Sequence, residues 1–253
     1  MMMTPIEGYR GKWRVIVFSS VLLGVVATTG WAQITNLSNG GSVNFSALVG
    51  TNGVSVLIGD KLFSNFGFSY VDTEGNIGNG LTASNLVLSS LFNQEGFGVS
   101  IQLPLVATGI TIKDVTLEFA ETVWDSSDEI SDVHLDFAGT VSGNGIAIVS
   151  ESIFTNGFGD GLLASLSLTE TASGFDPLGG EATAIYTEAQ SKIWVEKDIL
   201  VSGNPTAIPD NNPAKDYAAI TIINQTFSQI PEPSTMVLSL AGMVALLFVR
   251  RRQ

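Results

Sequence analysis

The stretch Val133-His134-Leu135-Asp136-Phe137 decides the fold class, because apolar and polar side chains alternate at every position. Successive side chains of a β-strand point to opposite faces, so this pattern is typical of a strand with one buried and one exposed face. The same alternation occurs on both sides of it along the chain. It is found at residues 99–103, 110–112, 115–119, 146–148, 162–168, 184–186, 193–195 and 220–223.

Turn-forming segments separate these stretches, for example Ser142-Gly143-Asn144-Gly145 and Asp160-Gly161. Glycine and asparagine accept the backbone conformations that tight turns need. Residues 183–190 come closest to a helical pattern, but strands flank them and we predict a strand there as well. The sequence therefore predicts an all-β fold, a single antiparallel β-sandwich with jelly-roll-like connections, over residues 33–230.

Composition limits what this predicted body can do. The chain contains no cysteine, which excludes disulfides, thiolate catalysis and cysteine-based metal sites. Residues 33–230 hold 5 of the 11 Lys and Arg residues but 22 of the 24 Asp and Glu residues, a net charge of about −17. Such a body repels phosphates, so we expect no nucleic-acid partner. Its acidity is compatible with divalent cations.

The N-terminal segment has the three parts of a secretory signal peptide. Arg10, Lys12 and Arg14 precede an apolar stretch at residues 15–27, and small residues follow at Gly30 and Ala32. This order predicts a signal peptide over residues 1–32, taken by the Sec translocon and cut by signal peptidase after Ala32. The alternative is an N-terminal anchor that is not cleaved.

The C-terminal segment combines a short polar motif, an apolar helix and a basic stop. Pro231-Glu232-Pro233-Ser234 leads into apolar residues 234–249, which Arg250, Arg251 and Arg252 follow. A helix of that length spans about 24 Å, and snorkelling arginines can extend it toward the roughly 30 Å of a hydrocarbon core. The arginines should stay in the cytoplasm, which places the body outside. Residues 225–230 are then predicted to be a short stalk. The alternative is a core helix at the chain end.

These three parts, in this order, resemble the PEP-CTERM sorting signal of bacteria. The resemblance implies recognition by exosortase, a membrane protease-transpeptidase that is thought to cut near Pro231, Glu232 and Pro233. It implies a transient anchor in the inner membrane, and then a place at the cell surface or outside the cell.

Two further phrases resemble segments of a group of PEP-CTERM surface proteins. They are Asp60-Lys61-Leu62-Phe63-Ser64-Asn65-Phe66 and Val195-Glu196-Lys197-Asp198-Ile199. The resemblance implies a secreted β-sandwich and assigns no chemistry. From the residues themselves, we interpret Leu62, Phe63 and Phe66 as core packing.

Two groups of side chains are candidate cation sites. Asp125, Asp128, Glu129 and Asp132 could supply the oxygen ligands that calcium prefers, although their spacing departs from the EF-hand pattern. The alternative is a solvated acidic loop. His134 is the only histidine, and in a strand it shares a face with Asp132 and Asp136. These three residues could bind a metal or carry out acid–base chemistry, or simply form a solvated face.

Sugar-binding and catalytic patterns are weaker. Exposed aromatic residues could stack on sugars, but burial in the core is the alternative for each candidate: Tyr70, Trp124, Tyr186 and Trp194. Two carboxylate pairs, Glu118 with Glu121 and Glu188 with Glu196, could be proposed for a glycosidase, but nothing fixes their separation. We therefore expect no enzyme and no cofactor other than calcium.

The expected function is that of an exported surface or extracellular-matrix protein that exosortase processes. It would be structural or adhesive and associated with exopolysaccharide. A secreted carbohydrate- or calcium-binding module is the alternative, and a polysaccharide hydrolase is the least favoured interpretation.

Overall fold

The computed structural model describes residues 33–38, 40–50, 54–73, 80–124, 128–204 and 215–231. The chain divides into two compact units, Met1–Trp31 and Ala32–Gln253, and every described residue belongs to the second. The predicted signal peptide, its cleavage site at Ala32 and the predicted C-terminal helix lie outside the described residues. Within the described ranges, no helix has both the length and the hydrophobicity that a membrane span needs.

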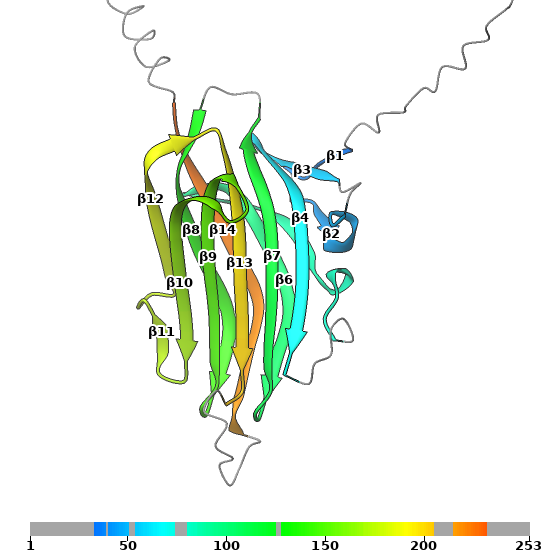
Figure 1. The fold of residues 1–253 in the computed structure, drawn as a ribbon, viewed down its shortest axis with the longest axis vertical. Coiled ribbons are helices and arrows are strands. Elements are labelled where there is room, and N and C mark those ends of the chain that lie inside the picture. Colours follow the sequence, from blue (N-terminus) through cyan, green and yellow to red (C-terminus); the bar gives the residue numbers. More distant parts are fainter. Residues whose placement is uncertain are drawn as a thin grey trace, which may run out of the picture. The chain divides into compact units, whose positions relative to one another are not determined.

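The described chain folds into two β-sheets (Figure 1). In spatial order, the larger sheet contains β1 (Ile34–Asn36), β3 (Ser55–Ile58), β4 (Lys61–Asp72), β7 (Ile112–Val123), β13 (Lys192–Ser202), β9 (Ile146–Gly157), β10 (Asp160–Thr171) and β11 (Gly174–Asp176). The smaller sheet contains β12 (Glu181–Gln190), β8 (Asp128–Ser142), β14 (Tyr217–Pro231), β6 (Gly96–Thr108), β5 (Val87–Asn93) and β2 (Ser42–Asn44). Two 3-10 turns, η1 (Phe45–Ala47) and η2 (Ala83–Asn85), complete the described elements.

The two sheets confirm the predicted all-β sandwich, and β12 confirms the strand predicted at residues 183–190. The prediction of a purely antiparallel arrangement is wrong for one short pair, because β1 and β3 run parallel. A parallel pair needs a crossover connection. Here the chain passes through β2, in the other sheet, before it returns as β3.

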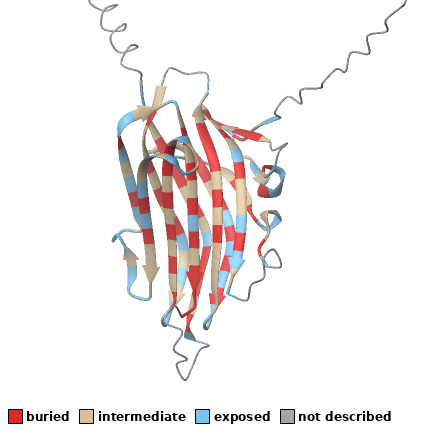
Figure 2. Ribbon diagram, viewed as in Figure 1, coloured by how far each residue is buried: buried red, intermediate tan, exposed pale blue. Residues whose placement is uncertain are grey.

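Alternation along the strands produces the core between the sheets. In β8, Val133, Leu135 and Phe137 are buried, while His134 and Asp136 are only partly covered on the opposite face. The same alternation of buried and less buried residues is visible along neighbouring strands (Figure 2). The apolar residues of the alternating sequence stretches therefore form the core, as the pattern predicts.

A bulge in β4 explains how both phenylalanines of residues 60–66 can face the core. Phe63 and Phe66 are three positions apart, so regular alternation would place them on opposite faces. Asn65 has a positive φ of 55°, and the pairing of β4 with β7 shifts in register between Ser64 and Gly67. The extra residue returns Phe66 to the interior. Both phenylalanines are buried, as the sequence predicts, but Leu62 is only half-buried on the opposite face of β4, so its predicted place in the core is wrong.

The predicted stalk at residues 225–230 is wrong. These residues form the second half of β14, which lies between β8 and β6 in the smaller sheet. Gln225 pairs with Leu135, and Ile230 pairs with Glu129. Gln225 occupies an inward position between Ile223 and Phe227, and this polar residue interrupts the apolar pattern that would otherwise mark the strand. The sandwich therefore continues up to Pro231.

Candidate metal-binding site

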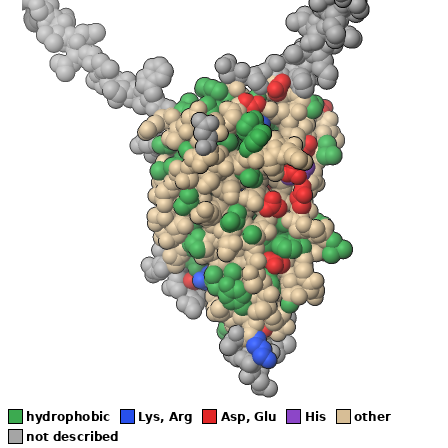
Figure 3. Space-filling model, turned by 180° about the vertical axis from the view of Figure 1, so that it is seen from behind, with side chains coloured by type: hydrophobic (Ala, Val, Ile, Leu, Met, Phe, Trp, Pro, Cys, Tyr) green, Lys and Arg blue, Asp and Glu red, His purple; other side chains and the backbone are tan. Residues whose placement is uncertain are grey.

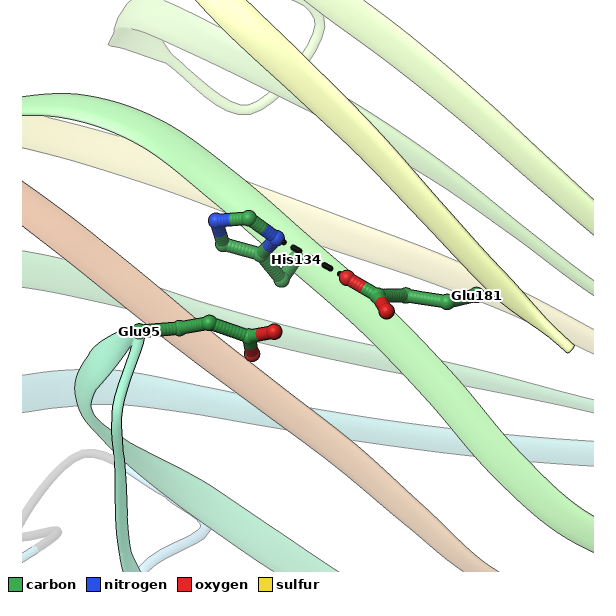
Figure 4. A group of neighbouring side chains, drawn as sticks. All are labelled: Glu95, His134 and Glu181. Carbon is green, nitrogen blue, oxygen red and sulfur yellow. Dashed lines mark hydrogen bonds and ion pairs between the residues drawn. The ribbon is translucent and has the colours of Figure 1, made fainter. Parts of the chain in front are cut away.

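Three side chains from separate elements meet on the outer face of the smaller sheet. Glu95 lies in the turn between β5 and β6, His134 lies in β8, and Glu181 begins β12. We call these three residues the carboxylate–histidine cluster. One ligand atom from each residue lies within 4.8 Å of the other two. Figure 4 shows the carboxylates of Glu95 and Glu181 turned toward the imidazole, with Glu95 reaching across β14.

Polar contacts at both ring nitrogens hold the imidazole of His134. Its Nδ1 lies 3.0 Å from Glu181 Oε1 and 3.0 Å from Thr183 Oγ1. Its Nε2 lies 3.3 Å from Asp132 Oδ1, which also accepts a hydrogen bond from the backbone N–H of Ser228 at 3.1 Å. Metal-binding histidines are commonly oriented this way, with the second ring nitrogen held by a carboxylate.

Glu95 is also held in place. Its Oε2 accepts hydrogen bonds from Thr226 Oγ1 and from Asn93 Nδ2, each at 3.1 Å. The hydroxyl of Ser228 donates to the Glu95 backbone carbonyl at 2.8 Å. The chain therefore fixes Glu95 at the sheet surface before any ligand is considered.

The cluster is reachable from solvent and carries a mixed ligand set. The side chain of His134 is 18% exposed and that of Glu181 is 46% exposed. Acidic side chains gather next to the histidine on this face (Figure 3). One imidazole nitrogen and two carboxylates suit a transition metal such as zinc, whereas calcium takes six to eight oxygen ligands.

Not all of the cation-binding residues predicted from the sequence lie beside His134. Asp132 lies beside His134, but Asp136 accepts a hydrogen bond from Asn224 Nδ2 at 2.8 Å. Burial raises the pKa of Asp136, although the bond from Asn224 acts in the opposite direction. Asp128 and Glu129 begin β8, and Asp125 lies outside the described residues. Calcium binding by that stretch stays a prediction.

Sequence reasoning missed Glu95 and Glu181. Neither residue stands near His134 in the sequence, and no spacing links them to it. They meet because of the sheet order. β12 lies beside β8, and the turn between β5 and β6 brings Glu95 over β14, on the other side of β8. The only local sign is a turn, which contains Glu95 and precedes Glu181.

The other candidate residues are dispersed. Tyr70 and Tyr186 are buried, Trp124 is 43% exposed, and Trp194 is half-buried with Lys192 Nζ lying 4.4 Å from its ring centroid.

The proposed glycosidase pairs do not share a face. Glu121 is buried between the sheets, whereas Glu118 lies on the opposite face of β7 and pairs in register with Glu196 of β13. Glu188 belongs to β12 in the other sheet.

Comparison with known proteins gave matches of two kinds, and no curated protein sequence matched. Among solved structures, TmCBM61 in complex with beta-1,4-galactotriose has 8% identity and a TM-score of 0.30, over 64% of this chain and 88% of that one. The Glycosylation Associate Protein (Gap123) complex from Streptococcus agalactiae has 10% identity and a TM-score of 0.29, over 64% of this chain and 26% of that one.

The second kind of match concerns the C-terminal residues. A family model described as the PEP-CTERM protein-sorting motif matches residues 229–253. This range contains Pro231, Glu232, Pro233 and the three arginines on which the resemblance rests. The resemblance is therefore confirmed, and the chain is a protein that carries the PEP-CTERM sorting motif.

Proposed function

We propose that this chain is a structural or adhesive protein of the bacterial surface or extracellular matrix, associated with exopolysaccharide. The observation that carries the proposal is the sorting motif at residues 229–253, which implies an exported protein that exosortase processes. The β-sandwich supports it, because two paired sheets enclose one apolar core without any cysteine. Its strongly acidic composition also suits a hydrated, cation-rich matrix.

The junction between sandwich and motif supports processing at Pro231, Glu232 and Pro233. Pro231 pairs with Asp128 at the last position of β14, so the motif begins where the sheet ends. A cut near this point would leave the paired residues of β14 in the released body. Exosortase would thus separate an intact sandwich from its anchor.

Intact-mass spectrometry of membrane and extracellular fractions from the native host tests the export and processing that this proposal requires. We expect an extracellular species that begins near Gln33 and ends near Pro231. The double variant Glu232→Ala/Pro233→Ala should stay in the membrane fraction at a higher mass, because the signal is no longer read. Ser173→Ala, in the turn between β10 and β11, is the matched control and should be released normally. A wild-type chain found only in membranes, with Arg250–Arg252 still attached, would refute the proposal.

A second candidate function is the binding of a divalent transition metal by the carboxylate–histidine cluster. Three potential ligands and a supporting carboxylate, Asp132, are already positioned there. Zinc would bind through His134 Nδ1 and one oxygen each from Glu95 and Glu181. The contact between His134 Nε2 and Asp132 would keep the ring oriented.

Calorimetric titration of the purified chain with zinc tests this site. His134→Ala should abolish binding, and Asp132→Asn should weaken it by about 10- to 100-fold, because it loosens the histidine. Glu188→Gln, an exposed residue on the same strand as Glu181, should leave the affinity unchanged. Equal zinc affinity in all four proteins would place the metal elsewhere. In a parallel titration with calcium, binding that survives in His134→Ala would favour the acidic stretch that begins at Asp125.

A further inference from the structure

Three of the polar side chains that lie between the two sheets form one connected group. Lys197 in β13 and Glu151 in β9 belong to the larger sheet, and Gln225 in β14 belongs to the smaller one. Their exposed fractions are 0%, 1% and 1%. Lysine and glutamate are almost never fully buried unless they are paired. Lys197 and Glu151 are paired with each other, and with Gln225 they form a group that we call the interior triad.

Strand register brings the interior triad together. Lys197 and Glu151 are direct partners in the pairing of β13 with β9, and both point inward. β14 packs across the core against both of these strands. Apolar neighbours on the same inward faces, including Val149, Ile153 and Phe227, are fully buried and exclude water. The triad therefore lies among apolar side chains, out of contact with bulk solvent.

Glu151 bridges the other two members of the triad. Its Oε2 accepts a hydrogen bond from Lys197 Nζ, and its Oε1 accepts one from Gln225 Nε2. The side-chain oxygen of Gln225 is buried and has no hydrogen-bond partner among the described residues. An amine and a carboxamide are thus held on the two oxygens of one carboxylate, and the carbonyl of the carboxamide is left without a partner.

Burial favours the neutral forms of both Lys197 and Glu151. Loss of hydration raises the pKa of the Glu151 carboxyl, while Lys197 and Gln225 act in the opposite direction. Loss of hydration likewise lowers the pKa of the Lys197 ammonium, against the attraction of Glu151. Proton transfer from Lys197 to Glu151 would produce a neutral amine, and that is the nucleophilic form of lysine.

We propose that Lys197 and Gln225 react to form an intramolecular amide bond that joins the two sheets, with Glu151 transferring the protons. The lone pair of Lys197 Nζ attacks Cδ of Gln225, and a new C–N bond forms. Glu151 takes a proton from the attacking nitrogen and delivers it to the carboxamide nitrogen. The original C–N bond then breaks, and ammonia leaves.

The reaction balances without an oxidant, reductant or other reagent. The ammonium of Lys197, the carboxylate of Glu151 and the carboxamide of Gln225 become a secondary amide, a neutral carboxylic acid and ammonia. Two buried charges disappear, which favours the product because buried charges are costly to keep out of water. The bond would also do what a disulfide does elsewhere, in a chain that has no cysteine.

Intact-mass spectrometry of the denatured full-length chain tests the proposal. The wild-type mass should be lower than that of the encoded chain by one ammonia, compared with Lys197→Met at its own encoded mass. Tryptic digestion should yield a branched peptide that contains both position 197 and position 225. Glutamine at a newly formed N-terminus, such as Gln33, also loses ammonia. The difference between wild type and Lys197→Met, together with the branched peptide, excludes that source.

Two variants separate the reaction from simple folding effects. Glu151→Gln keeps the shape of the bridge but removes the proton carrier, so the folded variant should retain its full encoded mass. Lys61→Met removes another fully buried lysine and should keep the ammonia deficit. A folded wild-type chain at full encoded mass would overturn the proposal. A deficit of one water instead of one ammonia would also overturn it, because the bond would then join Lys197 to Glu151.

Discussion

Asp114 and Asp198 share a hydrogen bond on the face of the larger sheet that points away from the core. Burial, the hydrogen bond to Asp198 and the charge of Asp198 together raise the pKa of Asp114 from about 3.8 to about 6. The folded chain therefore holds a proton that the unfolded chain releases. The stability contributed by this proton is complete below pH about 4 and is lost as the pH rises through about 6.

Asp114→Asn should remove this pH dependence, because an amide can keep the hydrogen bond without a titrating proton. We expect the variant to be more stable than wild type at pH 7, by less than about 1 kcal/mol because Asp198 is exposed and solvent screens its charge. The two proteins should converge near pH 4. Thermal unfolding at both pH values measures the effect. Asp160→Asn, at an exposed turn, is the control. Parallel pH profiles for wild type and Asp114→Asn would contradict this account.

At the level of the single element, the bulge in β4 determines which side chains support the core. The ring of Phe66 lies 5.5 Å from that of Phe45 and 6.1 Å from that of Phe119, measured between centroids. Leu62, four positions earlier, is only half-buried on the opposite face. Phe66 therefore anchors the core, whereas Leu62 in the same strand does not.

Phe66→Ala should lower the free energy of unfolding by about 3–5 kcal/mol, because it leaves a cavity among packed rings. Leu62→Ala should cost far less. Chemical denaturation of both variants under the same conditions gives the comparison. Losses of equal size would mean that β4 keeps a regular alternation through Asn65, in conflict with the register shift.

The sequence predicts the individual strands better than it predicts which strands lie next to each other. Alternation correctly assigned Val133 and Leu135 to the core and His134 to the opposite face, because that periodicity is a local property. It carries no information on strand partners, so Glu95 and Glu181 could not be connected to His134. The interior triad did leave a sign. Lys197 stands between Val195 and Ile199 in a period-two pattern, at a position that alternation assigns to the interior.

For the whole molecule, β14 links the fold to the sorting motif. It pairs with β6 and β8 at once, and it supplies Gln225 and Phe227 to the core. A chain ended after Pro231 should fold like the body that exosortase is proposed to release. A chain ended after Asn224 should not fold cooperatively, because both neighbouring strands lose hydrogen bonds and core contacts. Hydrogen exchange and thermal unfolding of the two truncated chains measure this. A cooperative transition in the shorter chain would show that residues 225–231 are dispensable.

The position of β14 also has a mechanical consequence. While the motif is still attached to the membrane, a pull on the body reaches the sandwich along the axis of this strand. β14 is bonded on both sides, so the load would act in shear on two ladders together instead of peeling them open bond by bond. Many bonds would have to fail at once. A tether that enters through an interior strand would therefore resist flow or drag better than one attached to an edge strand such as β2 or β11.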